Sequence, residues 1–148
     1  MTTDLRQTDE AEIGQLLERR AAATRAKDAD AATAAYADNV LTFDVVNPLQ
    51  HRGVGNVRER TKQWFDTFDG PIEYEMRDVE ISASDDSGFA HCLYRVSGIL
   101  ASGDALGMWV RATFCFRKLD TGWRIVHEHD SVPFDPTTGM ASLGLKPI

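Results

Sequence analysis

The sequence predicts an α+β domain in which helices come first and strands follow. Apolar residues fall at helical spacing from residue 9 to about residue 68, and in short β-branched and aromatic runs from residue 72 to residue 132. Short polar turns that contain glycine separate the later runs, which favours antiparallel hairpins. Because the two types of element are segregated along the chain, we expect helices packed on one face of an antiparallel sheet.

Three helices are predicted in the first half of the chain. The first begins at Asp9, which can form a capping box with Glu12, and it ends at Lys27. Asp28 can then cap a second, short helix. A third helix follows the segment Gly53-Val54-Gly55 and carries Val57, Trp64 and Phe65 along one side.

Strands are predicted over residues 40–46, 72–84, 89–100, 106–118 and 123–132. Side chains alternate between the two faces of a strand. In the first of these strands, Val40, Thr42 and Asp44 therefore share one face.

The composition excludes several classes of function. The chain has 148 residues, with 16 Lys and Arg against 23 Asp and Glu, so its net charge of −7 argues against nucleic acid or an anionic membrane as a partner. No run approaches the ~20 apolar residues of a membrane span and the first residues are polar, so a cytoplasmic protein is expected.

Cys92 and Cys115 have no metal-ligand spacing and are expected to be reduced and buried. We expect no metal and no cofactor.

The last predicted hairpin allows its register to be worked out. A loop over residues 119–122 sets Phe114 opposite His127 and Ala112 opposite His129, which gives an apolar face with two histidines. Glu128 then points to the opposite face, as does Asp130. A slip of one residue would reverse these faces.

The preceding turn extends the register by one strand. A turn at Gly103-Asp104 sets Arg95 opposite Ala112, in line with His129, so Arg95 could bind an anion or a carbonyl group on that face; the alternative is a surface arginine. His127 and His129 could act in acid–base chemistry, serve as structural residues, or ligate a metal with Asp44 or Glu128 as the third ligand.

Three segments resemble a known family. They are Tyr36-Ala37-Asp38-Asn39-Val40 before a strand, His51-Arg52-Gly53 before the third helix, and the strand that runs from Trp123 through His127-Glu128-His129-Asp130 to Pro133. Over residues 10–133 the chain resembles the nuclear transport factor 2-like superfamily, and within it the SnoaL-like group related to ketosteroid isomerases. The resemblance implies a cone-shaped barrel, in which a strongly curved antiparallel sheet wraps around three N-terminal helices and encloses a pocket. It also implies a homodimer through the outer sheet face. Residues 1–148 would form one domain, with residues 134–148 as a C-terminal arm.

The resemblance also implies roles for particular residues. Asp44 falls where ketosteroid-isomerase-like enzymes carry their general base, although it could instead bond to the Asn47-Pro48 turn or to Arg52. Arg20 stands where those isomerases carry a tyrosine, and residues 109–116 supply no acid as a second donor. These departures argue against steroid isomerisation itself.

The function expected from the sequence is proton transfer on an apolar carbonyl compound by a cofactor-independent isomerase-, cyclase- or dehydratase-like enzyme. The catalytic residues would be Asp44 and His127. The residues expected to contact a small carbonyl or carboxylate ligand are His129, Arg95, Trp64 and Phe114. The alternative is a module of the same fold that binds a small ligand or assembles as a dimer without chemistry.

Overall fold

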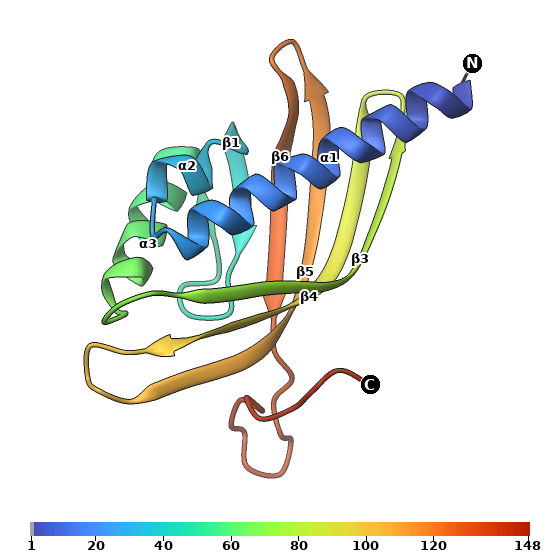
Figure 1. Cartoon of the computed structure of the whole chain (residues 1–148). Helices are drawn as coiled ribbons and strands as arrows, with labels where there is room; N and C mark the ends of the chain where they lie inside the picture. Colours follow the sequence, from blue (N-terminus) through green and yellow to red (C-terminus); the bar gives the residue numbers. More distant parts are fainter. Residues whose placement is uncertain (1) are drawn as a thin grey trace.

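The computed structural model of the protein describes residues 2–148. Its helices are α1 (Thr2–Arg25), α2 (Ala29–Thr33) and α3 (Val54–Asp66). Its strands are β1 (Tyr36–Phe43), β2 (His51–Arg52), β3 (Glu73–Ser84), β4 (Ser87–Ile99), β5 (Ala105–Leu119) and β6 (Gly122–Ser131). Figure 1 shows the helices gathered on one face of the sheet, with α1 crossing it. None of the helices described over residues 2–148 has the length and apolar character needed to cross a lipid bilayer.

All six strands belong to one sheet, in the order β2-β1-β6-β5-β4-β3. The predicted α+β class, with helices on one face, is confirmed. Two features differ from the prediction. β1 pairs with β6 in parallel, whereas all other neighbours are antiparallel. The sheet is also open, with β2 and β3 as its edges, so a closed barrel does not form.

Local sequence signals explain most of the helix boundaries. The Asp28 side chain accepts a hydrogen bond of 3.0 Å from the backbone N–H of Ala31, so the predicted cap of α2 is confirmed. Gly53, with φ of 89°, precedes α3 in a conformation that favours glycine.

The predicted start of the first helix at Asp9 is wrong, because α1 already begins at Thr2. The Asp9 carboxylate instead accepts hydrogen bonds from Lys118 Nζ at 2.9 Å and from Trp123 Nε1 at 3.2 Å. It therefore ties α1 to the β5–β6 hairpin. The hydrogen bond from Lys118 lowers the pKa of Asp9.

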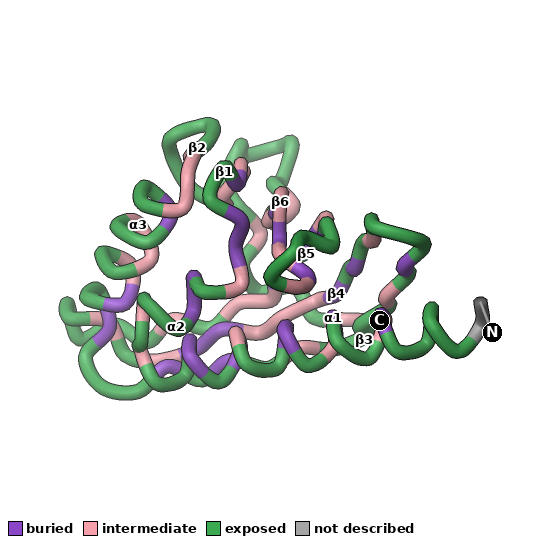
Figure 2. The backbone as a smooth tube through the Cα atoms, turned by 90° about the horizontal axis from the view of Figure 1, so that it is seen from above, coloured by how far each residue is buried: buried purple, intermediate pink, exposed green. Residues whose placement is uncertain are grey.

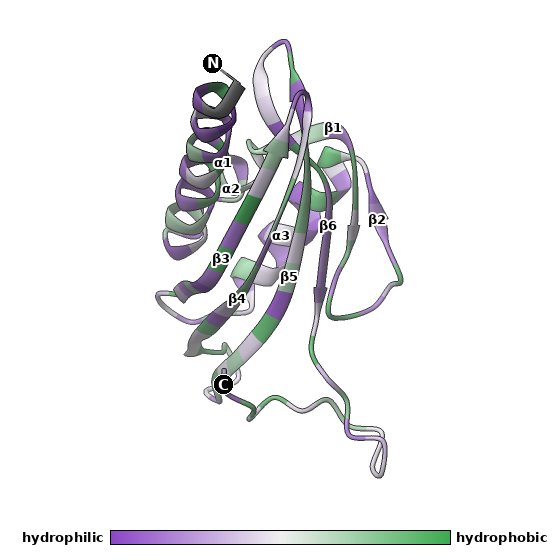
Figure 3. Ribbon diagram, turned by 90° about the vertical axis from the view of Figure 1, so that its right-hand side faces the viewer, coloured by the Kyte–Doolittle hydropathy of each residue, from purple (hydrophilic) through white to green (hydrophobic). Residues whose placement is uncertain are grey.

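The core lies between α1 and the inner face of the sheet, where Figure 2 shows buried positions on both. Along β5 the buried positions alternate with more exposed ones, and the same alternation is visible in the hydropathy colours of Figure 3. The largest fully buried side chains include Phe114, Phe116, Ile13, Leu17 and Ile125. Both cysteines are free, and burial raises the pKa of the Cys92 thiol to about 11.

A β-bulge in β6 changes the register of the last hairpin. Near the loop, Phe116 lies opposite Ile125, as the sequence predicts. The next pair joins Cys115 to His127, so Val126 is an extra residue without a partner across β5. An extra residue of this kind moves every later side chain to the other face.

The consequence is that the predicted faces of the end of β6 are wrong. Phe114 lies opposite Glu128 rather than His127, and Ala112 lies opposite Asp130 rather than His129. The acidic side chains of β6 therefore face the helices, and its histidines face the outer side of the sheet.

The register predicted for β4 and β5 is also wrong. Their connection spans residues 100–104, and Arg95 lies opposite Trp109 rather than Ala112. Arg95 accordingly lies on the outer face, where its Nη1 donates a hydrogen bond of 3.0 Å to Ser97 Oγ. The loop is longer than the expected turn, which shifts the pairing by three positions.

Residues 132–148 form an arm that leaves the end of β6 and extends away from the sheet (Figure 1). A short turn in this arm is closed by an antiparallel bridge between Phe134 and Ala141. The homodimer expected through the outer sheet face stays a prediction.

Candidate active site

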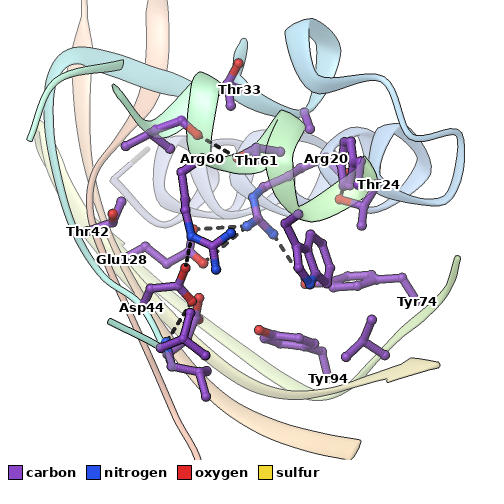
Figure 4. Close-up of a pocket in the computed structure, with 18 of the residues that line it drawn as sticks. Arg20, Thr24, Thr33, Thr42, Asp44, Arg60, Thr61, Tyr74, Tyr94 and Glu128 are labelled. Carbon is purple, nitrogen blue, oxygen red and sulfur yellow. Dashed lines mark hydrogen bonds and ion pairs between the residues drawn. The ribbon is translucent and has the colours of Figure 1, made fainter. Parts of the chain in front are cut away.

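A cavity of about 150 Å³ lies between the helices and the inner face of the sheet (Figure 4). Its walls come from α1, α2, α3 and strands β1, β3, β4, β5 and β6, together with the segment after β1. Five charged or acidic side chains line it: Arg20, Asp44, Arg60, Glu128 and Asp130. This concentration of ionisable groups in a partly enclosed space marks it as the candidate site.

Arg20 forms the centre of a buried network at one end of this cavity. The side chain is only 15% exposed. Its Nε donates to the Tyr36 hydroxyl at 3.0 Å, its Nη1 to the Tyr74 hydroxyl at 3.3 Å, and its Nη2 to both carboxylate oxygens of Glu128 at 3.1 and 3.2 Å. Each nitrogen of the guanidinium group therefore has a protein acceptor.

Glu128 is the anionic partner in this network. It is almost fully buried and also accepts a hydrogen bond from the Tyr36 hydroxyl. Burial alone would raise the pKa of Glu128, but the positive charge of Arg20 and the hydrogen bonds outweigh it, and the pKa is lowered. Glu128 is therefore a carboxylate at neutral pH.

Asp130, two residues further along β6, has the opposite character. Its Oδ1 is buried and has no hydrogen-bond partner among residues 2–148. Burial, followed by the negative charge of Glu128, raises the pKa of Asp130 well above its ordinary value. This shift favours an uncharged carboxylic acid at a position that lines the cavity.

Asp44 lies just beyond the end of β1 and lines the same cavity. Its Oδ1 accepts a hydrogen bond of 2.7 Å from the backbone N–H of Val45, and its Oδ2 lies 3.5 Å from Arg60 Nε. Both contacts suit the ionised carboxylate. The sequence left open a bond from Asp44 to the Asn47-Pro48 turn or to Arg52. In the structure the charged partner of Asp44 is instead Arg60, on α3.

The rest of the cavity is largely apolar. Trp64 from α3 lines it, and so do Phe65, Val96 and Met108. The ring of Tyr94 stacks on Tyr74 at a centroid distance of 4.9 Å. A flat apolar group has a matching surface here.

Phe114, predicted to contact a ligand, lies in the core outside the cavity wall. Its side chain is fully buried. The guanidinium carbon of Arg20 lies 5.3 Å from the centroid of the Phe114 ring, so Phe114 packs against the buried network.

The two histidines of β6 lie outside the cavity. His127 Nδ1 is 2.8 Å from the carbonyl oxygen of Leu41, and the ring of Phe43 packs edge-on against His127 at 4.7 Å and against His129 at 5.3 Å. The predicted pairing of Asp44 with His127 in one cavity is therefore wrong, because the bulge at Val126 turns the histidines to the outer face. Among residues 2–148, no group of three or more His, Cys, Asp or Glu side chains is placed to hold a metal ion, so the alternative of a metal site at these histidines is wrong.

Several residues of this site were missed by sequence reasoning. From the sequence alone Arg20 stands out only as a departure from a tyrosine, and the predicted register puts Glu128 and Asp130 on the wrong face. A signal was present for Arg20, since an arginine on the inward stripe of an amphipathic helix needs a buried acid as its partner.

The comparisons with known proteins agree with this fold. Residues 13–135 match the SnoaL-like domain family. The chain belongs to this family. No curated protein matches the sequence closely enough to indicate a relationship.

Solved structures with the same fold include an NTF2-like protein of unknown function from Pseudomonas putida KT2440. It is 32% identical over 95% of this chain and 98% of its own, with a TM-score of 0.88. A ketosteroid isomerase-like protein from Erwinia carotovora is 22% identical over 83% of this chain and 95% of its own, with a TM-score of 0.72. A provisionally named dehydratase from Streptomyces avermitilis is 20% identical over 84% of this chain and 96% of its own, with a TM-score of 0.73. These last two likenesses concern the fold.

Proposed function

We propose that this SnoaL-like protein is a cofactor-independent enzyme that moves a proton on a small carbonyl compound. Asp44 would be the general base and Asp130 the general acid. The observation that carries the proposal is the contrast between these two carboxyl groups. Asp44 is held by Arg60 and a backbone N–H in contacts that suit its anion, whereas burial and Glu128 raise the pKa of Asp130. Groups whose environments favour opposite protonation states are suited to opposite roles.

The chemistry requires both roles in one place. Asp44 takes the proton from the carbon next to the carbonyl group, and the electron pair of the broken C–H bond moves toward the carbonyl oxygen. Asp130 donates a hydrogen bond or its proton to that oxygen, which stabilises the enolate or gives the enol. With a β,γ-unsaturated ketone, Asp44 returns the proton to the γ carbon while any proton given to the oxygen goes back to Asp130, and the conjugated ketone is the product.

The surrounding network supports this division of roles. Arg20 and Glu128 neutralise each other and hold Tyr36 and Tyr74 in place. The negative charge of Glu128 acts on Asp130 and keeps its proton bound. His127, expected from the sequence as the proton donor, would be replaced in this role by Asp130.

The proposal is tested with cyclohex-3-enone in deuterated buffer. We expect the protein to accelerate both deuterium incorporation next to the carbonyl group, followed by NMR, and formation of the conjugated enone, followed by absorbance. Asp130→Asn keeps the shape of the acid but cannot supply its proton, so we expect a loss of about a hundredfold. Binding of the ketone without exchange or isomerisation would favour the non-catalytic binding module.

A further inference from the structure

Of the two arginines that line the cavity, Arg60 is the one with hydrogen-bond donors left free. Its side chain is 23% exposed and contacts Asp44 through Nε at 3.5 Å. Its Nη1 and Nη2 atoms make no hydrogen bond to any residue of the described chain, residues 2–148. Arg20, in contrast, uses all three of its nitrogens within the protein. The two arginines therefore differ in what they can offer a ligand.

The geometry of the guanidinium group determines which part of Arg60 is available. Asp44 lies at the Nε atom, which leaves the edge formed by Nη1 and Nη2. Figure 4 shows the Arg60 side chain reaching from α3 to Asp44, with its guanidinium group beside the cavity. Two parallel N–H groups at this edge match the two oxygens of a carboxylate.

Building on the proposed function, we propose that the substrate is an oxo acid, with a carboxylate that binds the free edge of Arg60 and an apolar or aromatic part that lies against Trp64 and Tyr94. The Arg60 guanidinium separates this carboxylate from Asp44, which limits the repulsion between the two anions. The carbonyl group of the same molecule would lie toward Asp130.

The charges in the cavity support an anionic group at Arg60 rather than at Arg20. Arg20 is neutralised by the bidentate contact with Glu128, and a second anion there would face a buried negative charge. The contact between Arg60 and Asp44 is longer and involves Nε. A ligand carboxylate bound to Arg60 also weakens the interaction between Arg60 and Asp44. The Asp44 carboxylate is then more available to accept a proton.

The test is a binding titration, followed by NMR, that needs no turnover. The probes are 4-oxo-4-phenylbutanoate and the corresponding uncharged amide, 4-oxo-4-phenylbutanamide. For the unmodified protein we expect the acid to bind about tenfold more tightly than the amide, as a charge-assisted bidentate contact allows. Arg60→Met should bind the two compounds equally, with the affinity for the amide unchanged, while Arg60→Lys should retain part of the preference.

Arg58→Met is the matched control. Arg58 lies two residues earlier on α3, is 45% exposed and pairs at 3.5 Å with Asp30. Its replacement removes the same charge from the same helix, and the tenfold preference should remain. If Arg60→Met and Arg58→Met reduce the preference equally, the effect is general electrostatics and the proposal is wrong.

Two other results would overturn the assignment. One is equal or tighter binding of the amide to the unmodified protein, and the other is no binding of either probe at millimolar concentration. Because turnover is not measured, these outcomes are distinct from a failure of the proton-transfer proposal. A preference for the acid that persists without any exchange activity would leave an oxo-acid-binding protein.

Discussion

Replacement of Glu128 by alanine is expected to destabilise the protein by about 3–5 kcal/mol, the usual cost of removing one partner from a buried ion pair. The loss leaves the Arg20 charge buried without its bidentate acceptor and removes the acceptor of the Tyr36 hydroxyl. The free energy of unfolding, measured by urea titration at pH 7, reports the effect.

Two further variants separate this effect from simple truncation. Glu80→Ala removes an exposed glutamate that pairs with His91 at 3.2 Å, and it should change the free energy of unfolding by at most about 1 kcal/mol. The double replacement Arg20→Met with Glu128→Leu removes both buried charges and should recover most of the loss. A double variant less stable than Glu128→Ala would contradict this account of the network.

Replacement of Asp44 by asparagine is expected to lower the rate of proton exchange on cyclohex-3-enone by about 10²–10⁴-fold. Asparagine is close to aspartate in shape but cannot accept the proton. The affinity for the ketone should change little, because the apolar wall that includes Trp64 is untouched.

The matched control is Asp38→Asn, which removes a carboxylate of β1 at an exposed position outside the cavity. It should leave the exchange rate unchanged. An unaltered rate in Asp44→Asn, with the ketone still bound, would show that another group is the base.

The sequence was sufficient to predict the fold class because that prediction depended on local patterns. The change in hydrophobic period separates the helices from β3–β6, and the cap at Asp28 depends on contacts within one turn. The pairing of Phe116 with Ile125 could also be predicted, because it lies close to a short loop that fixes the register.

The faces of the end of β6 could not be predicted in the same way. In the run from His127 to Asp130 both alternating sets are polar, so no hydrophobic pattern distinguishes the inner face from the outer one. The deciding feature is the bulge at Val126. A register counted outward from the loop assumes regular pairing and therefore does not include this extra residue.

The buried network around Arg20 shows a second limit. Its partners come from β1, β3 and β6, and Glu128 is 108 positions away in the sequence. Such contacts depend on the tertiary arrangement of the strands, to which local periodicity is insensitive. The candidate base Asp44 was found through resemblance and the candidate acid Asp130 only through the structure.

The most direct test of the central claim is a ¹³C NMR titration of the aspartate side-chain carboxyl groups in the unliganded protein, with Asp130→Asn used to assign the relevant signal. A raised pKa means that Asp130 keeps its proton at a pH where ordinary aspartates have lost theirs. The account predicts one carboxyl signal that stays protonated after the exposed aspartates have ionised and that is absent from Asp130→Asn. Ionisation of the Asp130 carboxyl together with the exposed aspartates would contradict it.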